Sequence, residues 1–242
     1  MNIAQKRVLI TGANRGIGRA LVTEALRRGA KRVYAGTRGT LDIVDERVTP
    51  LTLDVTDAEQ IEKAASQVGS LDVLINNSGI APYDDLSDPA VIERTLAVNF
   101  FGMYKVSRAF LPMLKRSKGA LVNNLSLMSL APFPMTPSYS ISKAAALSMT
   151  QSLRALLASQ SVTVHGVFLG PVDTDMTRGF EIPKASPDSV AQGIFDGLAN
   201  GEEDIFPDPM SQSIAEGWRK GVSIQQMGSH IWSTRDQFST QY

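Results

Sequence analysis

The sequence predicts an α/β fold: one domain built on a doubly wound parallel sheet of about seven strands, with helices on both faces. Two observations favour this fold class. Apolar runs of strand length alternate with longer segments of helical period along the chain. The strand runs are also apolar at nearly every position, which is typical of parallel strands buried on both faces. In sheets of this kind, ligands bind at the carboxyl ends of the strands.

Seven strands are expected at 7–12, 32–37, 48–55, 71–79, 120–127, 162–170 and 204–207. Five helices are expected at 17–29, 57–68, 89–116, 137–159 and 188–199. Thr56 and Glu59 have the spacing of a capping box for the second helix. Three prolines lie where first helical turns are expected, at Pro89, Pro137 and Pro187. The segment 36–46 is too short to predict a helix.

We expect residues 1–242 to form a single domain with its core at about 5–207 and a carboxyl-terminal tail at 208–242. After Pro209 the character of the sequence changes: 211–221 is a short amphipathic piece, and the residues that follow are polar and without a clear period. This tail is either a docking arm or an added segment. We therefore leave the last fifteen residues out of the functional interpretation.

The composition argues against several classes of function. Basic and acidic residues balance at 24 each without a run of either sign, so nothing favours a nucleic-acid or membrane partner. The absence of cysteine excludes disulfides and thiolate sites, and with only His165 and His230 no metal site is expected. No signal peptide is expected, and no apolar stretch approaches the roughly 20 residues of a membrane span. We expect a cytoplasmic protein.

The stretch TGANRGIG, residues 11–18, joins the first expected strand to the first expected helix. Glycines at 12, 16 and 18 let backbone N–H groups and the positive end of the helix converge on one point. That point suits a pyrophosphate. The alternative interpretation is a glycine-rich turn without a ligand.

The Thr-Gly-x-x-x-Gly-x-Gly spacing of this loop resembles the short-chain dehydrogenase/reductase family. Other motifs that resemble that family follow in order at strand ends or on helices: Asp54-Val55, Asn76-Asn77-Ser78-Gly79, Val98-Asn99, Ser126, Tyr139-x-x-x-Lys143 and Gly170-Pro171-Val172-Asp173-Thr174. The resemblance covers about residues 5–207. It implies a Rossmann-type fold, a nicotinamide dinucleotide cofactor and an oxidoreductase activity.

The resemblance also implies a set of cofactor-binding residues: Gly12, Asn14, Arg15, Gly16, Ile17, Gly18, Arg38, Asp54, Val55, Asn76, Ser78, Gly79, Tyr139, Lys143, Pro171, Val172 and Thr174. Thr37-Arg38 follows the second strand where an acid would favour NAD, so we expect NADP, with its 2′-phosphate bound by Arg38 and Arg15. The alternative is that both arginines are ordinary surface residues. Asp54 either binds the adenine amino group or forms a turn ahead of Thr56.

Tyr139 and Lys143 are four residues apart, so on a helix they share one face. We expect the Lys143 ammonium and an oxidised nicotinamide ring to lower the pKa of Tyr139, which then acts as general acid or base. The resemblance implies that Ser126 steadies the substrate oxygen, that Lys143 binds the nicotinamide ribose and that Asn99 holds a proton-relaying water. Ser129 and Ser138 are alternatives to Ser126, which alone ends a strand thirteen residues before Tyr139.

Together these residues predict hydride transfer between NADP(H) and a ketone or secondary alcohol. Three loops of mainly apolar character, at 80–86, 126–137 and 175–186, favour a hydrophobic carbonyl substrate. The alternative is a non-catalytic NADP-sensing regulator on the same fold. The resemblance implies that the helices at 89–116 and 137–159 carry the faces through which copies of the chain pair, so we expect a homodimer, with a tetramer left open.

Overall fold

The protein is described here by a computed structural model that covers residues 1–220. A seven-stranded sheet forms its centre, with the spatial order β3-β2-β1-β4-β5-β6-β7 and every neighbouring pair parallel. The strands are β1 (Arg7–Thr11), β2 (Arg32–Thr37), β3 (Val48–Thr52), β4 (Val73–Asn76), β5 (Ala120–Asn124), β6 (Thr163–Val167) and β7 (Asp204–Ile205). The predicted fold class is confirmed.

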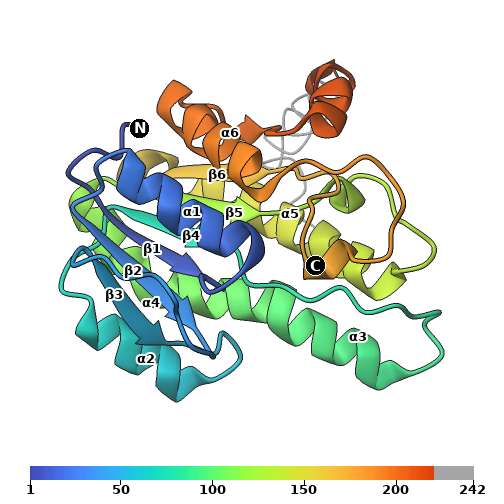
Figure 1. Cartoon of the computed structure of the whole chain (residues 1–242), viewed down its shortest axis with the longest axis horizontal. Coiled ribbons are helices and arrows are strands. Elements are labelled where there is room, and N and C mark those ends of the chain that lie inside the picture. The colour runs from blue at the N-terminus through green and yellow to red at the C-terminus, as the bar shows by residue number, and fades with distance from the viewer. Residues whose placement is uncertain (221–242) are drawn as a thin grey trace, which may run out of the picture.

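Helices cover both faces of this sheet (Figure 1). Helices α1 (Gly16–Arg27) and α6 (Pro187–Asn200) pack side by side on one face, and α2 (Ala58–Gln67), α4 (Met103–Ser117) and α5 (Pro137–Leu157) lie on the other. Successive side chains of a strand point to opposite faces, so Val8 and Ile10 join the core under α1 and α6, while Leu9 joins the core under α2 and α4. The uniformly apolar strands are therefore explained by two buried faces.

The helix expected at 89–116 is divided in the structure. It consists of α3 (Pro89–Leu96), a π-helical turn η1 (Ala97–Gly102) and α4. A Cβ atom on Gly102 would lie 2.7 Å from Cγ2 of Val55, so the helix approaches the segment after β3 closely at this turn. Single π-helical turns of this kind are frequent at functional sites, and this one contains Asn99.

Pro89, Pro137 and Pro187 each occupy the first helical turn, as predicted. The predicted capping box at Thr56 is wrong. Helix α2 begins one residue later than that box requires, because Asp57 caps it by accepting hydrogen bonds from the amides of Glu59 and Gln60. Both polar groups of Thr56 are directed instead to the Asp54 carboxylate.

Residues 209–220 are helical and pack on the sheet at its β6–β7 edge. The buried Asp208 carboxylate accepts hydrogen bonds from the amides of Gly170 and Ser211, at 2.9 and 3.0 Å. Trp218 donates to Asp204 at 2.8 Å and contacts the Phe168 ring. Packing thus extends beyond residue 207, where we expected the core to end. The last fifteen residues, with His230, lie outside the described residues.

Within residues 1–220, no helix combines the length and apolar character that crossing a membrane requires. The same range contains no group of three or more His, Asp or Glu side chains placed to hold a metal ion.

Two leucines provide a test of this core. Leu114 is fully buried in α4, whereas Leu156 in α5 is 66% exposed. We expect Leu114→Ala to lower the free energy of unfolding by roughly 2–5 kcal/mol, because it leaves a cavity in the packed layer. Leu156→Ala is the control and is expected to change it by less than about 0.5 kcal/mol. Urea unfolding of both variants measures the difference, and equal losses would contradict the assigned packing.

Candidate active site

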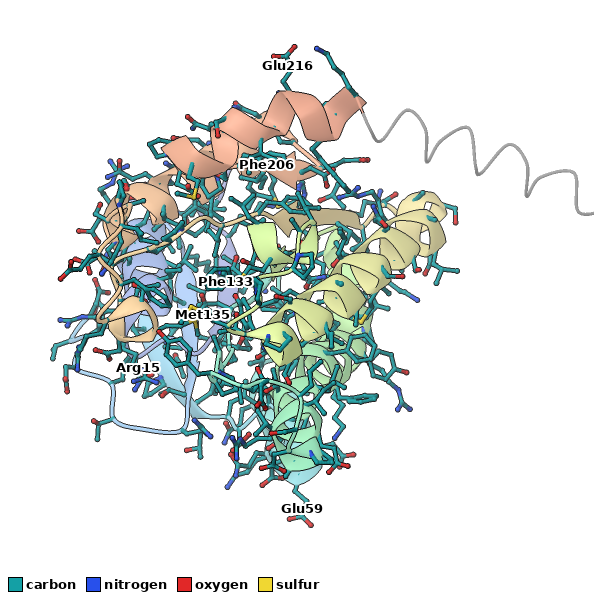
Figure 2. All side chains as sticks on the ribbon, turned by 90° about the vertical axis from the view of Figure 1, so that its right-hand side faces the viewer. Arg15, Glu59, Phe133, Met135, Phe206 and Glu216 are labelled. Carbon is teal, nitrogen blue, oxygen red and sulfur yellow. The ribbon has the colours of Figure 1, made fainter. Side chains whose placement is uncertain are left out.

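A groove of about 770 Å³ runs along the carboxyl ends of the central strands. Figure 2 looks onto this side of the molecule, with Arg15, Phe133 and Met135 labelled. The lining residues come from the glycine loop, from the segments that follow β2, β3 and β4, from α3 and η1, and from the segment after β6. From β1 the chain adds β2 and β3 on one side of the sheet, and from β4 it adds β5, β6 and β7 on the other. In parallel sheets a crevice opens where the strand order reverses in this way, here between β1 and β4.

The glycine loop has a backbone conformation that other residues resist. Gly12 and Gly16 have φ of +67° and +51°, and a Cβ atom on Gly18 would lie 2.0 Å from the carbonyl oxygen of Gly12. No side chain caps the start of α1, where Arg15 is the first flanking residue. The loop and the uncapped amides face the groove, an arrangement that fits a pyrophosphate.

Arg15 and Arg38 both line the groove, as the sequence predicted, but each is paired with a carboxylate. A nitrogen of Arg15 lies 3.3 Å from Asp175, and one of Arg38 lies 3.7 Å from Asp54. No acid directly follows β2 in the sequence, but the segment after β3 brings the Asp54 carboxylate next to Arg38. Side chains this exposed, 72% for Arg15 and 68% for Arg38, form weak ion pairs.

Asp54 forms the turn ahead of Thr56, which was one of its two expected roles; the other was an adenine contact. Its Oδ1 accepts hydrogen bonds from the amide and the hydroxyl of Thr56, at 2.9 and 2.7 Å. Burial opposes ionisation of Asp54, but the hydrogen bonds from Thr56 and the charge of Arg38 outweigh it, so the pKa lies below its ordinary value. Asp54 and Val55 nevertheless line the groove, so the turn places the Asp54 carboxylate beside it.

Three predicted catalytic side chains lie together at the end of β5 and the start of α5. Ser126 follows β5, and Tyr139 and Lys143 occupy successive turns of α5, all of them buried. Ser126 lies close enough to the Tyr139 hydroxyl to lower its pKa, and Lys143 Nζ lies 5.5 Å from the centre of the Tyr139 ring. Lys143 donates to the carbonyl oxygen of Asn124 at 2.7 Å.

The two alternatives to Ser126 are engaged elsewhere. The Ser129 hydroxyl donates to the backbone oxygen of Ser126 at 2.6 Å, and the Ser138 hydroxyl donates to Asp84. The Ser126 hydroxyl donates to the Leu169 carbonyl at 3.5 Å and accepts from the Met128 amide at 3.2 Å, and it is the serine that acts on Tyr139, whose pKa it lowers.

Burial shifts the pKa values of the tyrosine and the lysine in opposite directions. Loss of hydration raises the pKa of Tyr139 to about 12, although the hydrogen bond to Ser126 opposes the shift. Loss of hydration lowers the pKa of Lys143 to about 8. The expected fall in the pKa of Tyr139 is wrong for the protein alone, because the loss of hydration of the phenolate raises the pKa by more than Ser126 lowers it.

Asn99 connects the groove to this catalytic cluster. Its amide accepts from the backbone N–H of Ile80 and donates to the Ile80 carbonyl and to Ser142, at 2.8–2.9 Å. Gly79, at the end of the groove, sits between them: a Cβ atom there would lie 3.4 Å from Asn99 Oδ1 and 3.9 Å from Lys143 Nζ. The groove and the buried cluster are thus adjacent at Gly79.

Comparison with known proteins agrees with this arrangement. The family model for short chain dehydrogenases matches residues 6–184. The chain belongs to the short-chain dehydrogenase family. It is thereby a member of a family of oxidoreductases.

Individual relatives show how far the similarity extends. Rat (Rattus norvegicus) estradiol 17-beta-dehydrogenase 2 is 35% identical over 191 residues, which are 72% of this chain and 50% of the relative. NADPH-dependent 1-acyldihydroxyacetone phosphate reductase of Schizosaccharomyces pombe is 37% identical over 183 residues, 71% of this chain and 61% of the relative. The chain spans about half to two thirds of the length of these curated relatives.

One solved structure matches nearly the whole chain. A short chain dehydrogenase from Burkholderia cenocepacia, crystallised in complex with NADP, superimposes with a TM-score of 0.86 and 37% identity. The match covers 93% of this chain and 98% of that one.

Not every residue that the family resemblance suggested reaches the groove of this short-chain dehydrogenase. Asn76 is buried and donates to Ser107 and Asn123, so it joins β4 to α4 and β5. Pro171 and Val172 also lie outside the groove lining, and Val172 pairs with Ala185. The four predicted catalytic residues, Asn99, Ser126, Tyr139 and Lys143, likewise lie outside the lining and form the buried cluster next to the groove. The remaining predicted residues of the glycine loop and the strand ends line it, as does Thr174.

The sequence interpretation missed Asn77, although it belongs to the same motif as Asn76. The Asn77 amide donates to the carbonyl oxygens of Thr11 and Gly12 and accepts from Asn124, which ties the glycine loop to β5. The signal was present, since a strand alternates its faces: if Asn76 points into the layer under α4, its neighbour points away from it.

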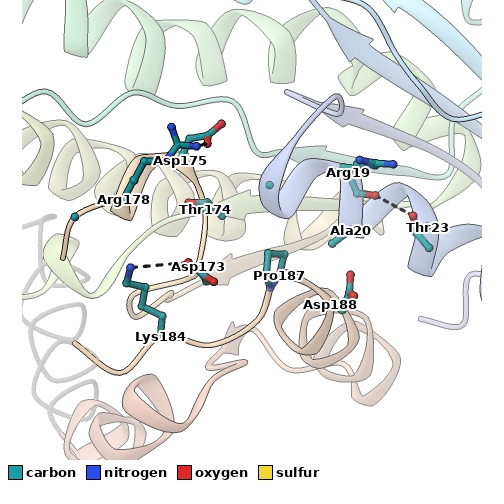
Figure 3. Close-up of a pocket in the computed structure, with 12 residues that line it drawn as sticks. Arg19, Ala20, Thr23, Asp173, Thr174, Asp175, Arg178, Lys184, Pro187 and Asp188 are labelled. Atoms are coloured by element: carbon teal, nitrogen blue, oxygen red, sulfur yellow. Dashed lines mark hydrogen bonds and ion pairs between the residues drawn. The ribbon is translucent and has the colours of Figure 1, made fainter. Parts of the chain in front are cut away.

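A second hollow of about 590 Å³ lies beside the groove and shares Gly16, Thr174 and Asp175 with it (Figure 3). Its lining is charged, with Arg19 and Asp188 among the exposed residues and Lys184 within 3.8 Å of Asp173. Ser126 and Tyr139 line neither hollow, but Gly79, where a Cβ atom would lie 3.9 Å from Lys143 Nζ, lines the groove and not the second hollow. The groove is therefore the one of the two that adjoins the catalytic cluster.

The lowered pKa of Lys143 makes stability depend on pH. Between about pH 8 and 10.5 the unfolded chain holds the Lys143 proton and the folded protein does not, so the free energy of unfolding rises with pH. Tyr139, with its raised pKa, acts in the opposite direction only above pH 10. From pH 8 to 10 we expect wild type to gain roughly 2 kcal/mol relative to Lys143→Met, measured by urea unfolding.

The matched control for this measurement is Lys105→Met on the surface of α4. The difference between wild type and this variant is expected to stay constant over the same pH range. A constant difference for Lys143→Met as well would show that the Lys143 ammonium is hydrated in solution.

Proposed function

We propose that the protein is an NADP(H)-dependent oxidoreductase that reduces a hydrophobic ketone, with Tyr139 as the general acid. The observation that carries the proposal is the buried Ser126–Tyr139–Lys143 cluster next to Gly79, at the end of the groove. A groove without such a cluster would indicate only that the protein binds a ligand. A groove that leads to a buried, hydrogen-bonded tyrosine and a lysine of lowered pKa supports proton transfer.

The residues present fit a dinucleotide phosphate. Gly12, Gly16 and Gly18 leave the space above the start of α1 without side chains, so they would hold the pyrophosphate there. Arg38 and Arg15 lie in the groove near the end of β2 and would hold the 2′-phosphate in exchange for their weak pairs with Asp54 and Asp175. The NADP bound to the Burkholderia cenocepacia structure supports the choice of cofactor.

The chain's own residues then have distinct tasks. When bound, the nicotinamide supplies the hydride for the substrate carbon. Tyr139 donates its proton to the carbonyl oxygen, and Ser126 steadies that oxygen with a hydrogen bond. Lys143 would bind the nicotinamide ribose, and Asn99 holds Ile80 and Ser142 in place around it. A pKa of about 12 keeps Tyr139 protonated at neutral pH, which is the form that reduction needs.

The substrate class is inferred from the loops around this cluster. Tyr83 from the loop after β4 contacts Phe180 from the segment after β6, with 5.9 Å between ring centres. Met135, in the segment between β5 and α5, and Met176, in the segment after β6, are both exposed. Adaptable thioethers and aromatic rings favour an apolar ketone over a charged one.

A non-catalytic NADP sensor remains the alternative function, and the intact catalytic cluster argues against it. A homodimer is also proposed, because large apolar side chains stay exposed on the helices that we expect to pair. Phe101 in η1, Tyr104 in α4 and Ile141 in α5 are all exposed in the single chain.

The role of Tyr139 is tested with Tyr139→Phe. Removing the hydroxyl removes the proton donor, so we expect ketone-dependent NADPH oxidation to fall by about 10²- to 10⁴-fold. NADPH binding, followed by nicotinamide fluorescence, should change by less than about twofold because the groove is untouched. Tyr34→Phe, in β2 and outside the groove lining, is the control. If Tyr139→Phe kept its turnover, Tyr139 would not be the proton donor. If the wild-type protein bound NADPH but turned over no ketone of a broad panel, the sensor function would be favoured.

The cofactor preference is tested with Arg38→Ala. Loss of a guanidinium–phosphate contact is expected to weaken NADPH binding by roughly tenfold to a hundredfold and to leave NADH binding unchanged. Thr37→Asp should shift the preference in the same direction by repelling the 2′-phosphate. Arg116→Ala, in the last turn of α4, is the control. An unchanged ratio of NADPH to NADH affinity in Arg38→Ala would count against NADP.

A further inference from the structure

The helix that carries Tyr139 and Lys143 begins without a cap of its own. At the start of α5, Thr136 occupies the capping position, but its side chain makes no hydrogen bond to the first turn. The Thr136 hydroxyl is directed instead to the sulfur of Met128, at 3.7 Å. Pro137 follows and has no N–H to satisfy. Ser138 therefore carries the first amide of α5 that needs an acceptor.

That acceptor comes from another part of the chain. Asp84, in the loop after β4, accepts a hydrogen bond from the Ser138 amide through Oδ1, at 3.4 Å, and another from the Ser138 hydroxyl through Oδ2. The Asp84 amide in turn donates to the Met135 carbonyl at 3.3 Å. Ser138 is fully buried and Asp84 is partly buried, so these bonds are partly shielded from water. The Asp84 carboxylate also faces the positive end of the α5 dipole, and this attraction stabilises the carboxylate and the start of the helix.

The loop that supplies Asp84 is bound at both of its ends to the helices of the catalytic cluster. Ile80 is held by Asn99 of η1, and Asp84 is held by Ser138 of α5. Between them, Tyr83 contacts Phe180 across the substrate side of the site. Tyr139 directly follows Ser138 in the first turn of α5. A shift of this turn would move the Tyr139 hydroxyl relative to Ser126.

We propose that Asp84 is a positioning residue for the reaction: it caps helix α5 from the loop after β4 and thereby holds Tyr139 in line with Ser126. The inference rests on the proposed function, since Tyr139 is the group whose place matters. Asp84 acts through Ser138 and does not touch the reacting atoms. It also couples the substrate loop to the catalytic helix, because the same residue fixes both.

The test compares Asp84→Ala, Asp84→Asn and the neighbour variant Asp85→Ala. Asp85 is the matched control, because it is exposed in the same loop and bonds only locally, to the Ser87 amide. Asp84→Asn keeps an oxygen that can accept from Ser138, so partial rescue is expected. It also provides a second measurement should Asp84→Ala fold poorly.

Amide hydrogen exchange, measured on the protein without substrate, reports the cap directly. In Asp84→Ala we expect the segment 137–143 to exchange roughly tenfold faster, with a smaller change in Asp84→Asn and none in Asp85→Ala. Exchange that stays unchanged, or that rises equally across the sheet strands, would overturn the cap. Hydrogen exchange does not require catalysis, so it tests whether Asp84 caps α5 even if the protein turns over no ketone. A lack of turnover would contradict the proposed function and not the cap.

Steady-state kinetics with an apolar ketone report the positioning. We expect Asp84→Ala to lower kcat roughly tenfold while the KM for NADPH stays within about twofold, since Asp84 does not line the groove and Asn99 still holds Ile80 at the groove end of the loop. Asp84→Asn should recover part of kcat. Faster exchange of 137–143 with an unchanged kcat would show that Asp84 stabilises the helix without positioning Tyr139, and would overturn the inference.

Discussion

Burial of the Lys143 ammonium at the carboxyl edge of the sheet is the constraint on which the rest of the site depends. A buried cation must have an acceptor, and the carbonyl oxygen of Asn124 supplies it at the end of β5. The Asn124 side chain donates to Asn77, which holds the carbonyls of Thr11 and Gly12. Through these bonds the position of the lysine and the shape of the glycine loop are fixed together.

A second set of buried amide side chains, on β4 and β5, connects the sheet to α5. Asn76 donates to Asn123, and Asn123 donates to Thr150 of α5, all of them buried. The bonds run from β4 through β5 to the helix that carries Tyr139. The side-chain donors of Asn76 and Asn123 are satisfied between the sheet and α5, although the side-chain oxygens of Asn76 and Asn124 are buried without a hydrogen-bond partner among the described residues. The catalytic side chains are thus placed by polar contacts as well as by the apolar core.

The groove and the catalytic cluster differ in how firmly their charges are held. Arg15 and Arg38 are exposed and weakly paired, so a phosphate can replace their partners at small cost. Tyr139 and Lys143 are buried, and their pKa values are shifted by loss of hydration. The same fold therefore provides an exchangeable surface for a charged ligand and a rigid, poorly hydrated site for proton transfer. Asp84 would join these two regions to the substrate loop.

The sequence by itself determined the sheet, the alternation of strands and helices, the glycine loop and the Ser126, Tyr139 and Lys143 set, because apolar periodicity, glycine spacing and helical spacing are local properties. Only the tertiary structure decided which partners these residues have. It paired Arg38 with Asp54, turned Asn76 away from the groove, raised the pKa of Tyr139 and brought Asp84 to the start of α5. Each of these depends on contacts between segments far apart in the chain or on loss of hydration, which sequence spacing does not encode.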